Sequence, residues 1–308
     1  MIVCLVGPTA SGKSELSMQL AESLGAEIIS ADSALVYRGM NIGTAKPSHA
    51  DRARVPHWLI DTREPTEAYS AADFVSDAES AIADIQARGR IALVVGGTLL
   101  YVRALLQGLS TLPPADPKLR TVLASELQTR GAAELHAELG RVDPTAAARI
   151  HPNDPQRLLR ALEVYRQTGN AISSLQGAWK AAPRRTGLLL GLIPADRALL
   201  HTRIAARLDA MLAAGFLDEV RALMAVPGMH DDLPAMRAVG YRQALGHLRG
   251  EYGQDRFREL ALYATRQLAK RQLTWLRGEP DLNVFDPAGA EALNCMLTRI
   301  RSALDQSH

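Results

Sequence analysis

The first stretch of the chain that could do chemistry is GPTASGKS at residues 7–14, which matches the phosphate-binding pattern G-x-x-x-x-G-K-[ST]. In this pattern the glycines let backbone N–H groups face an anion, the lysine adds a positive charge, and the serine hydroxyl is a standard Mg²⁺ ligand. An apolar run, IVCLV, precedes the stretch and a helical pattern follows it, which is the setting that such a loop needs. The sequence therefore predicts a phosphate site, with Ser14 as a metal ligand, that consists of Gly7, Pro8, Thr9, Ala10, Ser11, Gly12, Lys13 and Ser14.

The phosphate need not belong to ATP. A typical phosphate-loop ATPase has an apolar strand that ends in Asp and completes the metal site. Here the apolar run at 91–95 ends in GGT, and the sequence has no convincing adenine-binding signature. A loop that holds two phosphates and one Mg²⁺ would hold any diphosphate ester equally well.

Two polar residues follow the predicted strands next to this loop. Asp32 follows the apolar run 26–30, and Thr98 follows the run 91–95. Open α/β sheets bind their ligands at the carboxyl ends of the strands. Asp32 is therefore a candidate general base or indirect metal ligand, although an Asp that caps a turn has the same pattern. Thr98 is a candidate partner for a phosphate or an attacking amine, and GGT as a plain turn is an equal alternative.

Three further charged residues have two interpretations each. Arg203 and Arg207 are four residues apart and share one face of a predicted helix, where they either clamp a phosphate or are solvated. Asp61, at the end of WLID, is most simply an acid at the end of a strand, and a metal role is the alternative.

Alternating strands and helices must position these residues. Runs at 2–6, 26–30 and 91–95 have the character of buried strands, and helical patterns lie between them. Ser70 and Asp73 form the capping-box pattern that begins the second of these helices. This order predicts an α/β fold, a phosphate-loop NTPase-like parallel sheet core flanked by helices. Strand character returns at 186–194, and the remainder, including 195–215 and 255–278, is predicted to be helical.

An all-helical insertion domain is predicted at 113–185. This segment has helical periodicity, several Pro breaks and no strand signal. Residues 1–112 and 186–308 then form the catalytic core.

Composition excludes several classes of protein. The chain has only two cysteines, Cys4 and Cys295, so neither a disulfide framework nor a four-cysteine zinc site can be built. Its apolar runs are shorter than the ~20 residues of a membrane span. Because the phosphate loop begins close to Met1, we expect no signal peptide. We expect a cytoplasmic protein without a membrane partner. The net charge of +2 does not by itself imply a polyanionic partner.

Local charge is more informative than net charge. Asp154 and Pro155 have the pattern of a helix start, and Arg157 and Arg160 follow in its first turns, where cations oppose the helix dipole. Either an external anion offsets this repulsion, or a local partner such as Asp154 or Glu163 does.

The segment 237–277 carries nine Lys and Arg residues against three acids, and Tyr241, Tyr263 and Trp275 lie among them. Cations mixed with aromatic rings are typical of an RNA-binding surface.

Six stretches in order resemble one family, the tRNA dimethylallyltransferases, also called tRNA isopentenyltransferases. They extend from residue 7 to residue 277 and read GPTASGKS, ADSALVYRGMNIGTAKP, GGTLLYVRALLQGL, IHPNDPQRLLRALEVYRQTG, RAVGYRQ and ATRQLAKRQLTWLR. Asn41 departs from the Asp that is usual in the family, and the C-terminal zinc finger of eukaryotic members is absent. The chain thus resembles the bacterial members.

The resemblance implies a reaction and a set of site residues. The family transfers a dimethylallyl group from dimethylallyl diphosphate to N6 of the adenosine just 3′ of the anticodon, and releases diphosphate. Residues 9–14 would bind the donor with Mg²⁺, and Asp32 would accept the proton of the amine. Lys13, Thr98 and Arg207 would hold the diphosphate or align the amine. The helical insertion would grip the tRNA anticodon stem-loop. The residues implied to contact tRNA are Asp32, Ser33, Ala34, Leu35, Thr98, Arg120, Gln156, Arg157, Leu158, Leu159, Arg160, Arg237, Ala238, Val239, Gly240, Tyr241 and Arg242.

Three alternatives remain open at this point. A small-molecule kinase of the shikimate-kinase kind shares the loop and the Asp, but it would not need the additional basic helices. An adenylate isopentenyltransferase shares the chemistry and would not need the insertion. A non-catalytic RNA-binding protein with a nucleotide switch would not need the combined set of Lys13, Ser14, Asp32 and Thr98. We expect a monomer, since RNA would cover the basic face.

Overall fold

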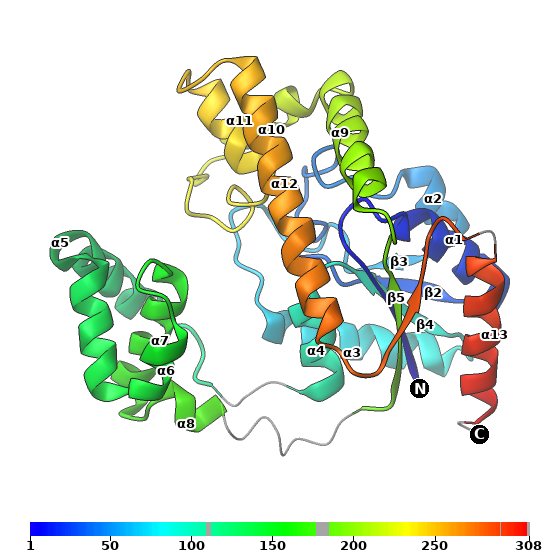
Figure 1. Cartoon of the computed structure of the whole chain (residues 1–308), viewed down its shortest axis with the longest axis horizontal. Coiled ribbons are helices and arrows are strands. Elements are labelled where there is room, and N and C mark those ends of the chain that lie inside the picture. Colours follow the sequence, from blue (N-terminus) through cyan, green and yellow to red (C-terminus); the bar gives the residue numbers. More distant parts are fainter. Residues whose placement is uncertain (109–111, 177–184, 290, 307–308) are drawn as a thin grey trace. The chain divides into compact units, whose positions relative to one another are not determined.

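A six-stranded parallel sheet organises the described part of the chain, residues 1–108, 112–176, 185–289 and 291–306 of a computed structural model (Figure 1). Its strand order is β3-β2-β4-β1-β5-β6, and every pair is parallel. The strands are β1 Ile2–Val6, β2 Glu27–Ser30, β3 His57–Trp58, β4 Ala92–Gly96, β5 Gly187–Leu192 and β6 Leu282–Phe285. The predicted parallel sheet is confirmed.

Helices cover both faces of this sheet, as the continuous apolar strands require. Alternate residues of β1 enter different hydrophobic clusters: Val3 and Leu5 pack with helices α1 and α13, while Cys4 and Val6 pack with the cluster that contains α3, α4, α9 and α12. Figure 1 shows α1 and α13 together on one side of the sheet. The helices around the sheet are α1 Lys13–Leu24, α2 His49–Arg54, α3 Ala71–Ala87, α4 Leu99–Gln107, α9 Arg197–Ala213, α10 Phe216–Met224, α11 Tyr241–Leu248, α12 Gln254–Arg277 and α13 Ala292–Asp305.

The local signals in the sequence specify where several helices begin. The predicted capping box is confirmed: Ser70 Oγ accepts a hydrogen bond from the Asp73 backbone N–H, and the Asp73 carboxylate accepts one from the Ser70 N–H. The helix predicted at 255–278 is α12. The helix predicted at 195–215 is α9, and Gly215, with φ of 94°, separates it from α10.

The sequence indicated one of the two edge strands and missed the other. The interpretation of Asp61 placed a strand at WLID, and the observed strand there, β3, ends at Trp58 before it reaches Asp61. The expectation that the chain after residue 194 is entirely helical is wrong at β6, a four-residue edge strand in which no residue is fully buried. β3 is only two residues long. Edge strands this short lack the long apolar run that identifies the central strands.

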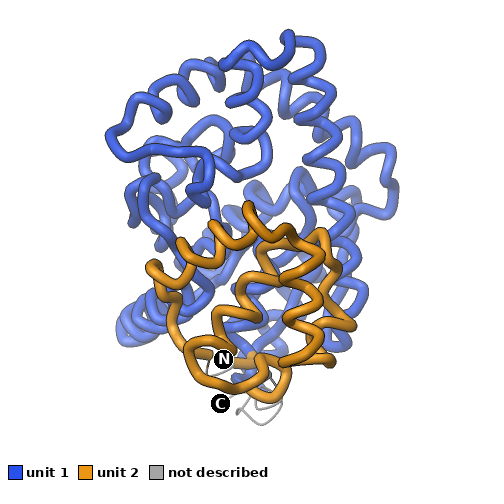
Figure 2. The backbone as a smooth tube through the Cα atoms, turned by 90° about the vertical axis from the view of Figure 1, so that its left-hand side faces the viewer, with its two compact units in different colours: residues 1–106, 185–308 blue, residues 107–184 orange. Residues whose placement is uncertain are grey.

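The chain divides into two compact units (Figure 2): residues 1–106 with 185–308, and residues 107–184. The second unit contains α5 Pro117–Val142, α6 Pro144–Arg149, α7 Pro155–Thr168 and α8 Ile172–Gln176, with no strand among its described residues. It has a hydrophobic core of its own, built around Leu123, Leu135, Leu139, Leu158 and Leu162. The insertion expected at 113–185 overlaps this unit, and its residues 177–184 lie outside the described part.

The chain leaves the first unit after Leu106 and returns to it at Arg185, and these two points are close together. The Arg185 backbone N–H donates to the Leu106 carbonyl at 2.9 Å, immediately before β5 begins. The second unit is therefore inserted between neighbouring points of the first. Across the described ranges, no helix is both long enough and apolar enough to cross a membrane.

Candidate active site

The phosphate loop connects β1 to α1, as predicted. Gly12, with φ of 92°, begins α1 in a left-handed conformation that favours glycine. A Cβ atom on Gly7 would lie 2.5 Å from the Leu192 carbonyl oxygen, so only glycine fits there. Lys13 folds back over the loop and its Nζ donates to the Pro8 carbonyl at 2.6 Å. The lysine amine is thereby held inside the loop.

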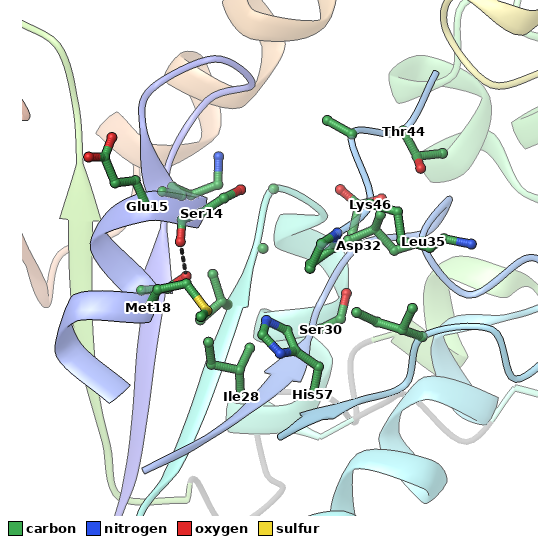
Figure 3. Close-up of a pocket in the computed structure, with 18 of the residues that line it drawn as sticks. Ser14, Glu15, Met18, Ile28, Ser30, Asp32, Leu35, Thr44, Lys46 and His57 are labelled. Carbon is green, nitrogen blue, oxygen red and sulfur yellow. Dashed lines mark hydrogen bonds between the residues drawn. The ribbon is translucent and has the colours of Figure 1, made fainter. Parts of the chain in front are cut away.

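A pocket of about 580 Å³ opens beside this loop. Figure 3 shows Ser14 and Met18 of α1 on one side of it, and Asp32 and Thr44 on the other. Between the two sides lie Ile28, Ser30 and His57, from β2 and β3. The pocket has the size and the mixed polar and apolar lining of a small-molecule site.

Asp32 and Thr98 follow the carboxyl ends of β2 and β4. They lie on the same side of the sheet, because these two parallel strands are neighbours in it. Asp32 Oδ1 accepts from the Ala34 N–H at 2.9 Å, and its carboxylate lines the pocket. The Thr98 hydroxyl accepts from the Ser33 N–H at 3.0 Å and donates to Ser33 Oγ at 3.3 Å. Thr98 therefore secures the turn that carries Asp32, and it must release the Ser33 hydroxyl in order to donate to a substrate.

A second pocket, of about 290 Å³, lies directly on the phosphate loop, and both Arg203 and Arg207 line it. The Arg203 Nη1 atom is 4.0 Å from the position that a Cβ on Gly12 would occupy. The Arg207 guanidinium donates to the Thr44 carbonyl at 3.3 Å. Both arginines are half-buried, so the structure favours the phosphate clamp over the solvated pair.

The buried cations perturb one another. Burial lowers the pKa of the Lys13 amine to about 8, the Asp32 carboxylate opposes this change, and Arg207 adds to it. Burial also lowers the pKa of Arg207, again against the effect of Asp32. Two cations that are costly to bury thus face a single carboxylate, and an anion bound at the loop would stabilise both.

Sequence reasoning missed Glu219 of α10, which fixes the loop that leads into Thr44. Its carboxylate accepts from the backbone N–H groups of Asn41 and Ile42, both at 2.7 Å. It also accepts from the Gly43 N–H at 3.1 Å and from the Tyr241 hydroxyl at 2.6 Å. No local pattern could reveal these contacts, because Glu219 is about 180 residues away from this loop in the sequence.

The predicted RNA-contact residues of the first unit differ in exposure. Arg237 and Arg242 are exposed, whereas Tyr241 is completely buried and its hydroxyl serves Glu219. The burial of the whole residue leaves no surface of Tyr241 for an RNA contact.

In the second unit, Arg120 and Arg160 both contact the buried Glu163 carboxylate, at 3.0 and 2.7 Å. Burial raises the pKa of Glu163, but hydrogen bonds from these two arginines outweigh it and lower the pKa overall. The local-partner interpretation of Arg160 is thus the one that the structure favours. Arg157 is different: its side chain is 73% exposed, with Asp154 3.5 Å away. Leu158 is fully buried and cannot offer its side chain to RNA.

Asp61 is engaged by two cations: it pairs with Lys46 at 2.5 Å and with Arg52 at 2.8 Å. These ion pairs favour a structural role for Asp61 over the metal role that was its alternative interpretation.

The donor set of the pocket fits a Mg²⁺ ion that a diphosphate carries in. Nowhere in the described ranges do three or more His, Cys, Asp or Glu side chains gather in a way that could hold a metal ion. Mg²⁺ often takes only one or two protein oxygens and completes its shell with substrate phosphates and water. The Ser14 hydroxyl, which lines this pocket, can supply such an oxygen.

Comparison with known proteins decides the family. The sequence model described as IPP transferase matches residues 35–279. The chain belongs to the IPP transferase family. A curated relative named tRNA dimethylallyltransferase, from Stenotrophomonas maltophilia (strain K279a), is 58% identical over 93% of this chain and 92% of its own length. A second, from Methylibium petroleiphilum, is 58% identical over 90% of this chain and 86% of its own length.

Solved structures extend the comparison to the fold of IPP transferases. The tRNA isopentenylpyrophosphate transferase of Bacillus halodurans has a TM-score of 0.73 at 36% identity, covering 99% of this chain and 97% of its own. A eukaryotic dimethylallyltransferase acting on tRNA has a TM-score of 0.80 at 28% identity, covering 99% of this chain and 78% of its own. Since both alignments span nearly the whole chain, they include the phosphate loop, which precedes the range matched by the family model.

Proposed function

We propose that this chain is the enzyme that transfers a dimethylallyl group from dimethylallyl diphosphate to N6 of the tRNA adenosine on the 3′ side of the anticodon, position 37. The assignment of roles to particular residues rests on which side chains line the two pockets of the site. Lys13, Arg203 and Arg207 border the phosphate loop, and Asp32 lies across the pocket from Ser14. One side of the site suits a diphosphate, and the other suits a nucleophile that must lose a proton.

The cationic side acts on the donor. The exocyclic amine of adenine is a poor nucleophile because its lone pair is delocalised into the ring, so the donor must ionise readily. An allylic C–O bond does so, and negative charge then grows on the departing diphosphate. The backbone N–H groups of the loop, Lys13 and the two arginines stabilise that charge more in the transition state than in the ground state. Mg²⁺ bound to the diphosphate would add further charge stabilisation there.

The opposite side acts on the acceptor. As the C–N bond forms, the amine gains positive charge and must lose a proton. We assign this proton to the Asp32 carboxylate, and its position in the lining of the pocket beside Lys13 and Ser14 supports the assignment. Thr98 keeps the Asp32 turn in place through Ser33, and its hydroxyl can align the amine once Ser33 is released.

The acceptor remains part of a folded tRNA. The target base must leave the anticodon-loop stack at a cost of about a few kcal/mol, and basic residues outside the pocket offset this cost through phosphate contacts. We assign this role to exposed Arg157, Arg237 and Arg242, and to the inserted helical unit. Because tRNA is the substrate, we place the enzyme in the cytoplasm and expect it to act as a monomer.

A label-transfer assay tests the proposal. The purified protein, Mg²⁺ and labelled dimethylallyl diphosphate are incubated separately with unmodified tRNA, with adenosine monophosphate, and with a tRNA whose target adenosine is replaced by guanosine. We expect label only in the first tRNA. Label in the mononucleotide would identify an adenylate prenyltransferase, and no transfer to either acceptor would reject the assignment.

A further inference from the structure

Gln272 of α12 joins two loops of the site that are far apart in the sequence. Its side-chain carbonyl accepts from the Thr9 backbone N–H at 2.8 Å, in the phosphate loop. Its amide nitrogen donates to the Gly97 carbonyl at 2.9 Å, in the turn before Thr98. Gln272 also lines the large pocket. One side chain thus connects the loop that binds the donor to the turn that supports the base.

Both ends of this connection require a glutamine. Thr9 presents a donor and Gly97 presents an acceptor, so the side chain between them must accept at one atom and donate at the other. A carboxylate of the same length can only accept, and a thioether of similar length does neither well. The amide also needs space, because a Cβ atom on Gly97 would lie 2.5 Å from the Gln272 nitrogen.

The helix that carries Gln272 is anchored in the core. Ala269, Leu273 and Leu276 of α12 are buried in the same hydrophobic cluster as strand residues Cys4 and Val6. The Cα of Gln272 therefore has little freedom to shift, and its amide sets the distance between the two loops. Reacting groups must be placed to within about 1 Å, and a misplacement of that size costs about 10²-fold in rate.

We propose that Gln272 is a positioning residue for prenyl transfer, an inference that rests on the proposed function. It holds the phosphate loop and the Gly97–Thr98 turn at the separation at which the acceptor amine reaches the donor carbon. Gln272 does not itself touch the reacting atoms. Its carbonyl also engages the Thr9 N–H, so the diphosphate binds to the N–H groups nearer Lys13.

Two variants of Gln272 test this role. Gln272→Met keeps the length and loses both hydrogen bonds, while Gln272→Glu keeps the bond from Thr9 and places a negative charge against the Gly97 carbonyl. Gln267→Met, at a half-buried position on the same helix, is the control. For each protein we would measure kcat at saturating substrates, tRNA affinity, affinity for inorganic diphosphate, and folding by circular dichroism.

We expect kcat to fall about 10²-fold in Gln272→Met and further in Gln272→Glu. Inorganic diphosphate should bind about fivefold more weakly to Gln272→Met, since one hydrogen bond of the loop is lost. The affinity of the Gln272 variants for tRNA should stay within about twofold of wild type. The control, Gln267→Met, should stay within about twofold of wild type in every assay.

A kcat within about twofold of wild type in either folded variant would overturn the inference, as would a loss of kcat matched by an equal loss of tRNA affinity. If one variant does not fold, the other decides. If the wild type transfers no prenyl group, the proposed function fails. Independently of that result, an unchanged affinity for inorganic diphosphate in Gln272→Met would reject the connection through Gln272.

Discussion

At the scale of single residues, the site is specified by a few charges. Lys13, Arg203 and Arg207 surround the phosphate loop, and Asp32 is the carboxylate that faces them. In the proposed mechanism the cations act on the donor and the carboxylate acts on the acceptor, so each function can be removed separately.

Removing the charge of Asp32 should slow the reaction strongly without weakening the binding of tRNA. Asp32→Asn retains an oxygen for the Ala34 N–H but cannot accept a proton, so we expect kcat to fall by about 10²-fold or more. Affinity for tRNA, measured by filter binding, should change little. Steady-state rates near those of wild type would show that another group is the base.

Donor affinity should depend on pH through Lys13. Burial lowers the pKa of this amine to about 8, so it is protonated below that pH and loses its charge above it. We expect the affinity for dimethylallyl diphosphate to be constant from about pH 7 to pH 8 and then to fall about tenfold for each further pH unit. The donor's own last proton leaves at about pH 6, outside this range.

Titration calorimetry across this pH range measures the effect. Lys13→Met should bind the donor weakly and show no pH step. A flat wild-type profile up to about pH 9.5 would mean that the charge of Lys13 does not contribute to binding.

At the scale of the elements, α9 and α12 bring side chains from distant parts of the sequence to the phosphate loop, and α10 brings one to the loop before Thr44. α9 brings Arg203 and Arg207, α10 brings Glu219, and α12 brings Gln272. The loop before Thr44 depends on Glu219 for three backbone hydrogen bonds.

Removing Glu219 should loosen this loop and reduce activity. Glu219→Ala leaves three N–H groups and the Tyr241 hydroxyl without their acceptor, so we expect the free energy of unfolding to fall by about 2 kcal/mol or more. Urea denaturation measures this change. Neighbouring Asp218→Ala is the matched control, since that side chain is 79% exposed and pairs with Arg221. Equal stability of the two variants would contradict the proposed function of Glu219.

The sequence predicted the elements whose signals are local. β1, β2, β4 and β5 are apolar runs, the first turn of α3 is a capping box, and the phosphate loop is a contiguous pattern. It predicted Asp32 and Lys13 because each follows such a signal directly. It offered the phosphate clamp by Arg203 and Arg207 only as one of two interpretations. It could not predict the roles of Glu219 and Gln272, since tertiary packing alone brings these side chains to the loop before Thr44 and to the phosphate loop. For Arg160 the sequence left an external anion and a local partner such as Glu163 as alternatives, and the ion pair with Glu163 favours the second.

At the scale of the whole molecule, donor chemistry and RNA binding should be separable. The first unit contains both pockets, and the second has its own hydrophobic core. Since Arg185 and Leu106 are hydrogen-bonded to each other, a short linker can join the chain across the place where the second unit is inserted.

Replacing residues 108–184 with a glycine-serine linker should leave donor binding intact and weaken tRNA binding. We expect donor affinity within about threefold of wild type and tRNA affinity reduced about tenfold or more, because phosphate contacts such as the one proposed for Arg157 would be lost. Calorimetry and filter binding measure the two affinities. Undiminished tRNA binding would place the RNA surface entirely on the first unit.

The most direct test of the central claim is to titrate the purified protein with dimethylallyl diphosphate and, separately, with ATP in the presence of Mg²⁺. We expect saturable binding of the prenyl diphosphate that Lys13→Met strongly weakens, and much weaker binding of ATP. Tight binding of ATP at the phosphate loop, without binding of the prenyl diphosphate, would contradict it.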